Sequence, residues 1–90
     1  VIEDHVKIDD LVHVGHNSKI KKFSQITVGS IIGGRVTIGQ ECWIAPHVVI
    51  DTGIEVGENS LIGTSSFVKA DVEKNSIMIG SPAKLLRKNV

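Results

Sequence analysis

The chain has 90 residues, the length of one small domain, and its ten Lys and Arg balance its ten Asp and Glu. Balanced charge argues against a nucleic-acid surface, which needs a basic excess. Phe and Trp total three residues and Tyr is absent, so aromatic side chains cannot fill the core. The single cysteine, Cys42, excludes an intrachain disulfide and a cysteine-rich zinc site, and we expect no bound metal.

The sequence also carries no sign of membrane insertion or export. No apolar stretch approaches the roughly eighteen residues of a membrane span, and no signal-type segment opens the chain. A lone cysteine suits a reducing compartment. We therefore expect a cytoplasmic protein that does not insert into a membrane.

A six-residue repeat runs through most of the chain, because Ile or Val recurs at every sixth position. The column comprises Ile2, Ile8, Val14, Ile20, Ile26, Ile32, Ile38, Ile44, Ile50, Val56, Ile62 and Val68. Four residues after each member stands a small or β-branched residue, such as Ser18, Val36 or Cys42. A period of six fits neither a helix nor simple alternation, so it predicts short strands separated by turns. Stacked strands would bury an aliphatic column that no single repeat could bury alone.

After the repeat, the pattern predicts a different C-terminal part. We expect the register to end at Lys74, with a turn at Lys74-Asn75, a last strand at 77–79 and a breaker at Gly80-Ser81-Pro82. Residues 83–89 predict a short basic helix or tail. The expected division is therefore a repeat over residues 1–73 and a strand with a basic tail over residues 74–90. The first repeat has no cap, which predicts a preceding N-terminal domain or further coils outside this chain.

The pattern over residues 2–73 resembles the hexapeptide-repeat acyltransferases. This resemblance implies an all-β fold, a left-handed parallel β-helix with three hexapeptides per coil and about four coils here. The segment Val14-Gly15-His16-Asn17 resembles the catalytic stretch of nucleotide-sugar N-acyltransferases. Residues 76–84 are similar to the Gly-x-Pro-Ala-Lys closing signature of members that use acyl-coenzyme A. The two nearest branches are the nucleotide-sugar N-acetyltransferases and the lipid A N-acyltransferases.

With three hexapeptides per coil, the third positions of the repeats stack into three corner columns. One is polar (Asp4, Lys22, Gln40, Glu58), the second carries Val28, Pro46 and Thr64, and the third carries His16, Gly34, Thr52 and Ala70. We place the functional site at the third column. Its small residues would leave a groove for an extended pantetheine arm beside the histidine.

The chemistry of acyl transfer fits this third column. An amine that attacks a thioester must lose a proton, and a neutral imidazole such as His16 can accept it. Gly34 can offer its backbone N–H to the oxyanion that forms. The resemblance implies catalytic roles for His16, Asn17 and Gly34, whereas a lone histidine without that context is commonly an ordinary surface residue. A carboxylate to orient His16 would come from Asp9, Asp10 or a neighbouring subunit.

The resemblance also implies acetyl-CoA as the acyl donor. It places the donor contacts at Gly34, Pro46, Thr64, Ser81, Pro82 and Lys84. The basic cluster Lys84, Arg87 and Lys88 could meet the 3′-phosphate of coenzyme A or an acidic carrier protein, or could simply face solvent. We expect Cys42 to be buried filler.

We therefore expect an N-acyltransferase that moves an acetyl group from acetyl-CoA to an amino group of a nucleotide-linked sugar. The alternatives are hydroxyacyl transfer from acyl carrier protein to a UDP-glucosamine derivative in lipid A synthesis, and a non-catalytic trimerising β-helix. The unbroken register argues against maltose-type and antibiotic-modifying acetyltransferases, which interrupt the helix with a long loop. The resemblance and the outward aliphatic positions imply a homotrimer with the site at the subunit cleft. These positions are Ile31, Val49, Leu61 and Phe67.

Overall fold

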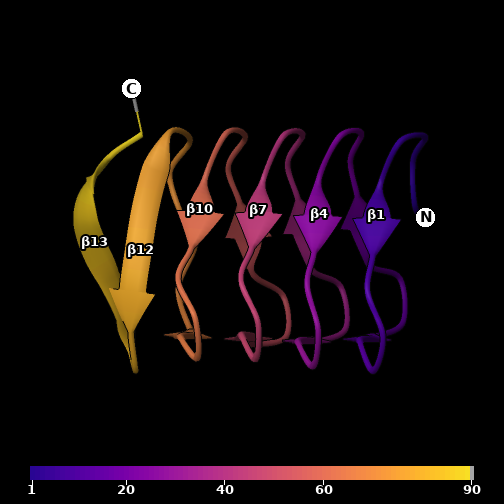
Figure 1. The fold of residues 1–90 in the computed structure, drawn as a ribbon, viewed down its shortest axis with the longest axis horizontal. Helices are drawn as coiled ribbons and strands as arrows, with labels where there is room; N and C mark the ends of the chain where they lie inside the picture. Colours follow the sequence, from indigo (N-terminus) through magenta and orange to yellow (C-terminus); the bar gives the residue numbers. More distant parts are fainter. Residues whose placement is uncertain (90) are drawn as a thin grey trace.

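The computed structural model describes residues 1–89, and these residues form strands and turns without a helix. Figure 1 shows successive coils stacked along the longest axis, with the N-terminus at one end and a two-stranded hairpin at the other. No helix that could cross a membrane is present in residues 1–89. Val90 lies outside the described residues.

Short strands build the coils, and each ends on a member of the aliphatic column. The two-residue strands are β1 (Lys7–Ile8), β2 (His13–Val14), β3 (Lys19–Ile20), β4 (Gln25–Ile26), β5 (Ile31–Ile32), β6 (Thr37–Ile38), β7 (Trp43–Ile44), β8 (Val49–Ile50), β9 (Glu55–Val56), β10 (Leu61–Ile62) and β11 (Phe67–Val68). Two longer strands follow, β12 (Ser76–Gly80) and β13 (Ala83–Lys88).

The strands form the three faces of a prism. Sheet A contains β3-β6-β9, sheet B contains β1-β4-β7-β10-β12-β13, and sheet C contains β2-β5-β8-β11. From β1 to β8, each strand pairs in parallel with the strand three positions further along the chain, so that Ile26, for example, lies opposite Ile44. β10 pairs in parallel with β12, two positions further on. The stacked short strands that the repeat predicts, and the parallel β-helix of about four coils that the resemblance implies, are therefore confirmed.

The interior is a stack of aliphatic and small side chains. Ile20, Ile26, Ile32, Ile38 and Ile44 are all fully buried. Cys42 is 2% exposed, which confirms it as buried filler, and burial raises the pKa of its thiol.

Buried serines between these columns satisfy backbone groups of the next coil. The Ser30 hydroxyl donates to the Ala45 carbonyl (2.9 Å) and accepts from the Val48 N–H (3.1 Å). Ser24 makes the same pair of contacts with Gly39 (2.7 Å) and Cys42 (3.1 Å). Because every buried polar side-chain atom in residues 1–89 has a partner, the serines add to the stack without a desolvation penalty.

The turns share one backbone conformation. The fourth residue of the repeat has a positive φ at almost every corner, including residues other than Gly such as Leu11 (60°), Asn17 (59°) and Phe23 (62°). Asn tolerates this left-handed region better than most residues. Asn17 therefore has a conformational reason to occupy its turn, independent of any catalytic role.

The repeat register shifts earlier than the expected Lys74. Val56 follows Ile50 by six residues, whereas Val72 follows Val68 by four, yet Val68 pairs with Ile50 and Val72 pairs with Val56. The turn over residues 69–71 is thus two residues shorter than its counterparts. The register is lost between Val68 and Val72.

The C-terminal segment also differs from expectation. The expected turn at residues 74–75 and the last strand, now β12, are present, but residues 83–88 form strand β13 and not a helix or tail. β13 pairs antiparallel with β12, from Ser76 opposite Lys88 to Gly80 opposite Ala83. Pairing with the open edge of β12 overrides the helix propensity of this Lys- and Leu-rich segment.

The outer faces of the three sheets differ in character. On sheet C the first residues of the strands include Ile31 (47% exposed), Val49 and Phe67, whereas on sheet A the equivalent positions are Lys19, Thr37 and Glu55. On sheet B, Trp43 is 44% exposed. The outward orientation expected for the apolar residues is confirmed.

Candidate functional site

The candidate site lies on the edge where sheet C meets sheet A, here named the His16 corner (His16, Gly34, Thr52 and Ala70). The Arg35 N–H donates to the His16 carbonyl (2.8 Å), and the Gly53 N–H donates to the Gly34 carbonyl (2.9 Å). These bonds tie successive turns together. They place His16, Gly34 and Thr52 in one column, as three hexapeptides per coil predict, whereas the turn around Ala70 is the shortened one.

The His16 side chain is exposed at this corner. None of the side-chain hydrogen bonds within residues 1–89 involves its imidazole, which leaves both ring nitrogens accessible to a ligand. Asp9 and Asp10 follow β1 and therefore lie at the edge between sheets B and C. The chain itself does not place either expected carboxylate at the His16 corner.

Two glycines shape the surface next to His16 in different ways. A Cβ on Gly15 would lie 2.6 Å from the Gly34 nitrogen, a distance that real side chains do not adopt, so Gly15 is required for the coils to stack. A Cβ on Gly34 would lie 3.5 Å from the His16 carbonyl oxygen, which is ordinary contact. Packing therefore does not require glycine at position 34, and its absent side chain leaves the surface beside His16 open. Gly15 was not among the predicted site residues, although it belongs to the Val14-Gly15-His16-Asn17 segment.

Two of the four histidines have structural contacts elsewhere. The ring of His5 stacks on Phe23, with centroids 5.0 Å apart and planes 4° from parallel. The imidazole of His47 occupies the space where Gly29 would carry a side chain. His13 lies on the outer face of sheet C and His16 at its edge, and both are exposed. No group of three or more His, Cys, Asp or Glu in residues 1–89 converges as a metal site.

The remaining predicted contact residues lie away from the His16 corner. Pro46 and Thr64 occupy turns between sheets B and C. Ser81 and Pro82 form the turn between β12 and β13, and Lys84 lies in β13. Sheet C therefore separates these residues from His16, Asn17 and Gly34. Within one chain, His16, Asn17 and Gly34 lie at one edge of sheet C, and the other predicted donor contacts lie beyond its opposite edge.

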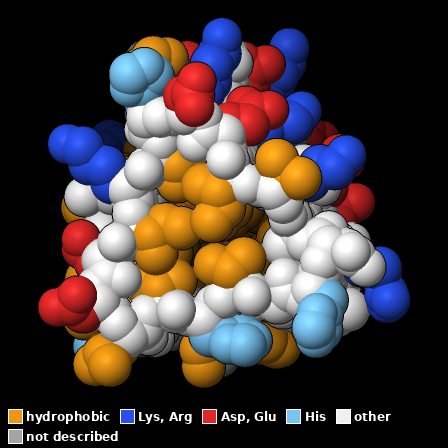
Figure 2. Space-filling view, turned by 90° about the vertical axis from the view of Figure 1, so that its right-hand side faces the viewer, with side chains coloured by type: hydrophobic (Ala, Val, Ile, Leu, Met, Phe, Trp, Pro, Cys, Tyr) orange, Lys and Arg blue, Asp and Glu red, His pale blue; other side chains and the backbone are white. Residues whose placement is uncertain are grey.

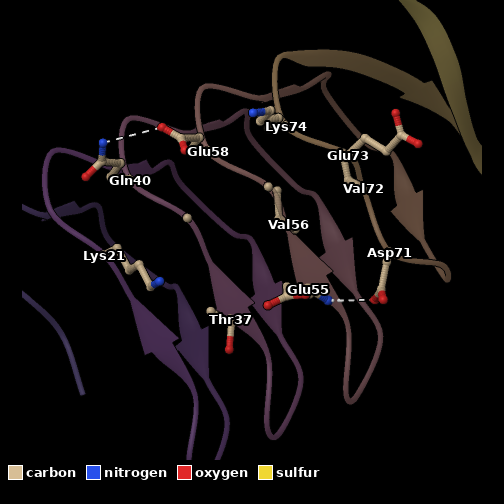
Figure 3. A pocket seen from close by; sticks show the side chains of 12 residues that line it. Lys21, Thr37, Gln40, Glu55, Val56, Glu58, Asp71, Val72, Glu73 and Lys74 are labelled. Atoms are coloured by element: carbon tan, nitrogen blue, oxygen red, sulfur yellow. Dashed lines mark hydrogen bonds between the residues drawn. The ribbon is translucent and has the colours of Figure 1, made fainter.

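A polar groove of about 540 Å³ crosses the outer face of sheet A (Figure 3). Its lining includes Lys21, Thr37, Gln40, Glu55, Glu58, Asp71 and Lys74. Glycines 39 and 57 lie in its floor, and Asp71 accepts a hydrogen bond from the Glu55 N–H (2.8 Å). None of the site residues predicted from the sequence lines this groove. It arises where the shortened turn ends sheet A, a feature that the repeat pattern does not reveal.

Sequence comparisons relate this chain to transferases. The model described as bacterial transferase hexapeptide (six repeats) matches residues 35–70. Galactoside O-acetyltransferase of Escherichia coli is 39% identical over 59 residues, which cover 66% of this chain and 29% of that protein. Chloramphenicol acetyltransferase of Agrobacterium fabrum is 37% identical over 70 residues, which cover 78% of this chain and 34% of that protein. The chain spans about a third of the length of these curated relatives.

Solved structures share the fold at lower identity. LpxA from Acinetobacter baumannii superposes with a TM-score of 0.93 at 21% identity, over 94% of this chain and 33% of that one. PerB from Caulobacter crescentus, in complex with CoA and GDP-perosamine, gives a TM-score of 0.64 at 18% identity, over 94% of this chain and 53% of that one. At these identities the likeness concerns the fold alone.

Proposed function

We propose that this chain, whose residues 35–70 match the hexapeptide-repeat model of bacterial transferases, is an acyltransferase of that family. The proposed reaction moves an acetyl group from acetyl-CoA to an amino group of a nucleotide-linked sugar. The observation that carries the proposal is the His16 corner, where an exposed imidazole stands in one column with Gly34 and Thr52. The curated relatives are named acetyltransferases, which supports the reaction class.

In the proposed mechanism His16 acts as the general base. Its neutral imidazole takes a proton from the acceptor amine as the nitrogen attacks the thioester carbonyl carbon. The carbonyl oxygen becomes an oxyanion, which the backbone N–H of Gly34 stabilises. Collapse of this intermediate breaks the carbon–sulfur bond, and the His16 imidazolium returns the proton to the departing thiolate of coenzyme A.

A second polypeptide completes the proposed site. Pro46, Thr64, Ser81, Pro82 and Lys84 are separated from His16 by sheet C, so one acetyl-CoA molecule meets both groups where two copies adjoin. We propose a cytoplasmic homotrimer, in which the exposed apolar residues of sheets B and C, such as Trp43 and Ile31, face neighbouring copies. A neighbouring copy would also supply the carboxylate that orients His16.

A hydroxyl acceptor is the second candidate, and a specific observation favours it. The curated relative that is 39% identical is named an O-acetyltransferase. A hydroxyl must lose a proton on attack just as an amine must, so His16 would have the same role. The two candidate reactions differ in the acceptor group, and His16 and Gly34 have the same roles in both.

The direct test is acetyl transfer from acetyl-CoA to a panel of acceptors, with release of the coenzyme A thiol and product mass as readouts. We expect transfer to a UDP-linked amino sugar and none to the same sugar already N-acetylated. Transfer to a neutral galactoside alone would support the hydroxyl acceptor. Thioester consumption that no acceptor stimulates would contradict both candidates.

A further inference from the structure

The two ends of the coil stack differ in what lies at the surface. At the N-terminal end apolar side chains reach the surface (Figure 2), whereas strands β12 and β13 lie at the C-terminal end (Figure 1). β13 itself has little apolar contact, because residues 84–88 are all exposed, including Leu85 (54%) and Leu86 (57%). Leu85 and the buried Val72 both line a cavity of about 240 Å³, so the strand does not pack tightly on the last coil.

Side-chain amides hold the C-terminal end of β13. The Asn89 N–H donates to the Asn75 carbonyl (2.8 Å), and the Asn89 side-chain amide donates to the Asn59 carbonyl (3.0 Å). The Asn59 side-chain amide donates to the Asn75 side-chain oxygen (2.8 Å) and to the Asn89 carbonyl (3.3 Å). Asn59 thus contacts both other residues, and we name this group the amide clasp (Asn59, Asn75 and Asn89).

The backbone conformation of these corners does not by itself produce the clasp. Asn59 and Asn75 have φ values of 56° and 58°, in the left-handed region that Asn tolerates. Glu41 occupies the equivalent corner one coil before Asn59 and has a φ of 58°, but its side chain is exposed and makes no hydrogen bond within residues 1–89. All three residues of the clasp are half-buried, which shields their hydrogen bonds from water.

The strand that the clasp holds is cationic. Lys88 forms an ion pair with Glu73 (3.3 Å), whereas Lys84 and Arg87 make no ion pair within residues 1–89. Arg87 lies two residues before Asn89 and opposite Ile77 of β12. An arginine and a lysine without acidic partners attract a phosphate group. Because β13 packs so little, the positions of these two cations depend on its pairing with β12 and on the clasp.

We infer that Asn59 is a positioning residue of the donor site. Through the amide clasp it holds β13 so that Arg87 and Lys84 meet the 3′-phosphate of coenzyme A. The part that concerns the phosphate rests on the proposed function, whereas the clasp itself does not. If β13 is in place for only a fraction of the time, the apparent affinity for the phosphate falls by that fraction. Transfer of the acyl group at His16 is unaffected once the donor is bound.

The test uses two Asn59 variants and a matched control. Asn59→Gly removes the amide and keeps the left-handed corner, whereas Asn59→Asp keeps the side-chain size and loses both donated hydrogen bonds. Glu41→Gly makes the same backbone change at the equivalent corner. We expect the amides of β13 to exchange hydrogen about tenfold faster or more in both Asn59 variants, and at the original rate in Glu41→Gly. Exchange in β7 and β10 should stay unchanged in all three.

The donor measurement compares coenzyme A with 3′-dephospho-coenzyme A by titration calorimetry. We expect the unmodified protein and Glu41→Gly to prefer coenzyme A. Both Asn59 variants should bind coenzyme A about tenfold more weakly and the dephosphorylated form as before, so that the preference is lost. The KM for acetyl-CoA should rise by the same factor with kcat unchanged. A general loss of structure would instead weaken the binding of both ligands alike.

Unchanged exchange of β13 in both Asn59 variants would overturn the clasp. Faster exchange with an unchanged preference for the 3′-phosphate would overturn the positioning role, because β13 would then move without effect on the donor. If the unmodified protein bound neither ligand, the proposed function and the donor part of the inference would fail together, and hydrogen exchange would still decide whether the clasp holds β13.

Discussion

The inward and outward positions of the coil stack differ in how strictly their residue types repeat. Inward positions repeat almost without variation on all three faces, as the fully buried Ile20, Ile26 and Ile32 of sheets A, B and C illustrate. Outward positions differ from face to face, with Ile31 and Val49 on sheet C and Thr37 and Glu55 on sheet A. The inward side chains therefore determine the fold. The outward side chains, which interior packing does not constrain, determine the function.

The sharpest test of this contrast uses two neighbouring isoleucines of β5. Ile32 is fully buried and Ile31 is 47% exposed, although both have the same side chain and belong to the same strand. We expect Ile32→Ala to lower the free energy of unfolding by about 2–5 kcal/mol, because it removes packing and leaves a cavity. Ile31→Ala should cost less than about 1 kcal/mol in the isolated chain. Urea unfolding of both variants measures the difference.

A reversed order would contradict the contrast between inside and outside. If Ile31→Ala cost as much as Ile32→Ala, the outer face of sheet C would already be packed against another copy under the conditions of the measurement. Repeating the unfolding at tenfold lower protein concentration separates that case, since only a subunit contact depends on concentration.

The second-largest expected loss of stability comes from removing a buried serine hydroxyl. Ser30→Ala removes the hydroxyl that bridges the Ala45 carbonyl and the Val48 N–H, and it leaves both groups buried without a partner. We expect a loss of about 1–3 kcal/mol in the free energy of unfolding. The exposed Ser65 is the matched control, and its replacement by Ala should be close to neutral. A neutral Ser30→Ala would contradict this expectation and would indicate that water reaches the two backbone groups.

Substitution at a corner residue should give the smallest change in the free energy of unfolding, and this change should be stabilising. Leu11 is 86% exposed and has a φ of 60°, so it contributes little packing and occupies a strained conformation. Leu11→Gly should raise the free energy of unfolding by about 0.5 kcal/mol, because relief of about 1–2 kcal/mol of strain exceeds the entropy cost of glycine. Leu11→Val should lower it, since a β-branched residue fits this region poorly. Destabilisation by both replacements would mean that the Leu11 side chain has a contact that its exposure conceals.

The sequence alone predicted most of the interior. Ile or Val at every sixth position, with a small or β-branched residue four positions later, leads to paired short strands, and the structure has them. The same pattern predicts inward positions for Ser30, which is fully buried, and for Cys42, which is 2% exposed. These predictions succeed because each repeat reports the same packing constraint, so that the signal accumulates along the chain.

The C-terminal part could not be predicted in the same way. A two-residue shortening at 69–71 changes the register once and leaves no periodic signal. Strand β13 forms because β12 offers an open edge, a tertiary condition that the composition of residues 83–88 does not show. The polar groove on sheet A depends on the first of these events and was missed with it.

The site was predicted in part for a related reason. With the three hexapeptides per coil that the resemblance implies, residues of one column are eighteen positions apart, so the stacking of His16 with Gly34 could be predicted. The same spacing put Pro46 in a different column, whereas the place of Ser81 depends on the β12–β13 hairpin, which the repeat does not predict. The catalytic role of His16 itself remains a prediction.

The measurement that tests the central claim most directly compares thioester consumption by two histidine variants in the presence of an acceptor. His16→Ala should reduce the acceptor-dependent rate by about 10²–10⁴-fold, the usual contribution of a general base. His13→Ala, on the outer face of sheet C, should retain most of it. If His16→Ala stayed within about threefold of the unmodified protein while remaining folded, His16 would not be the base.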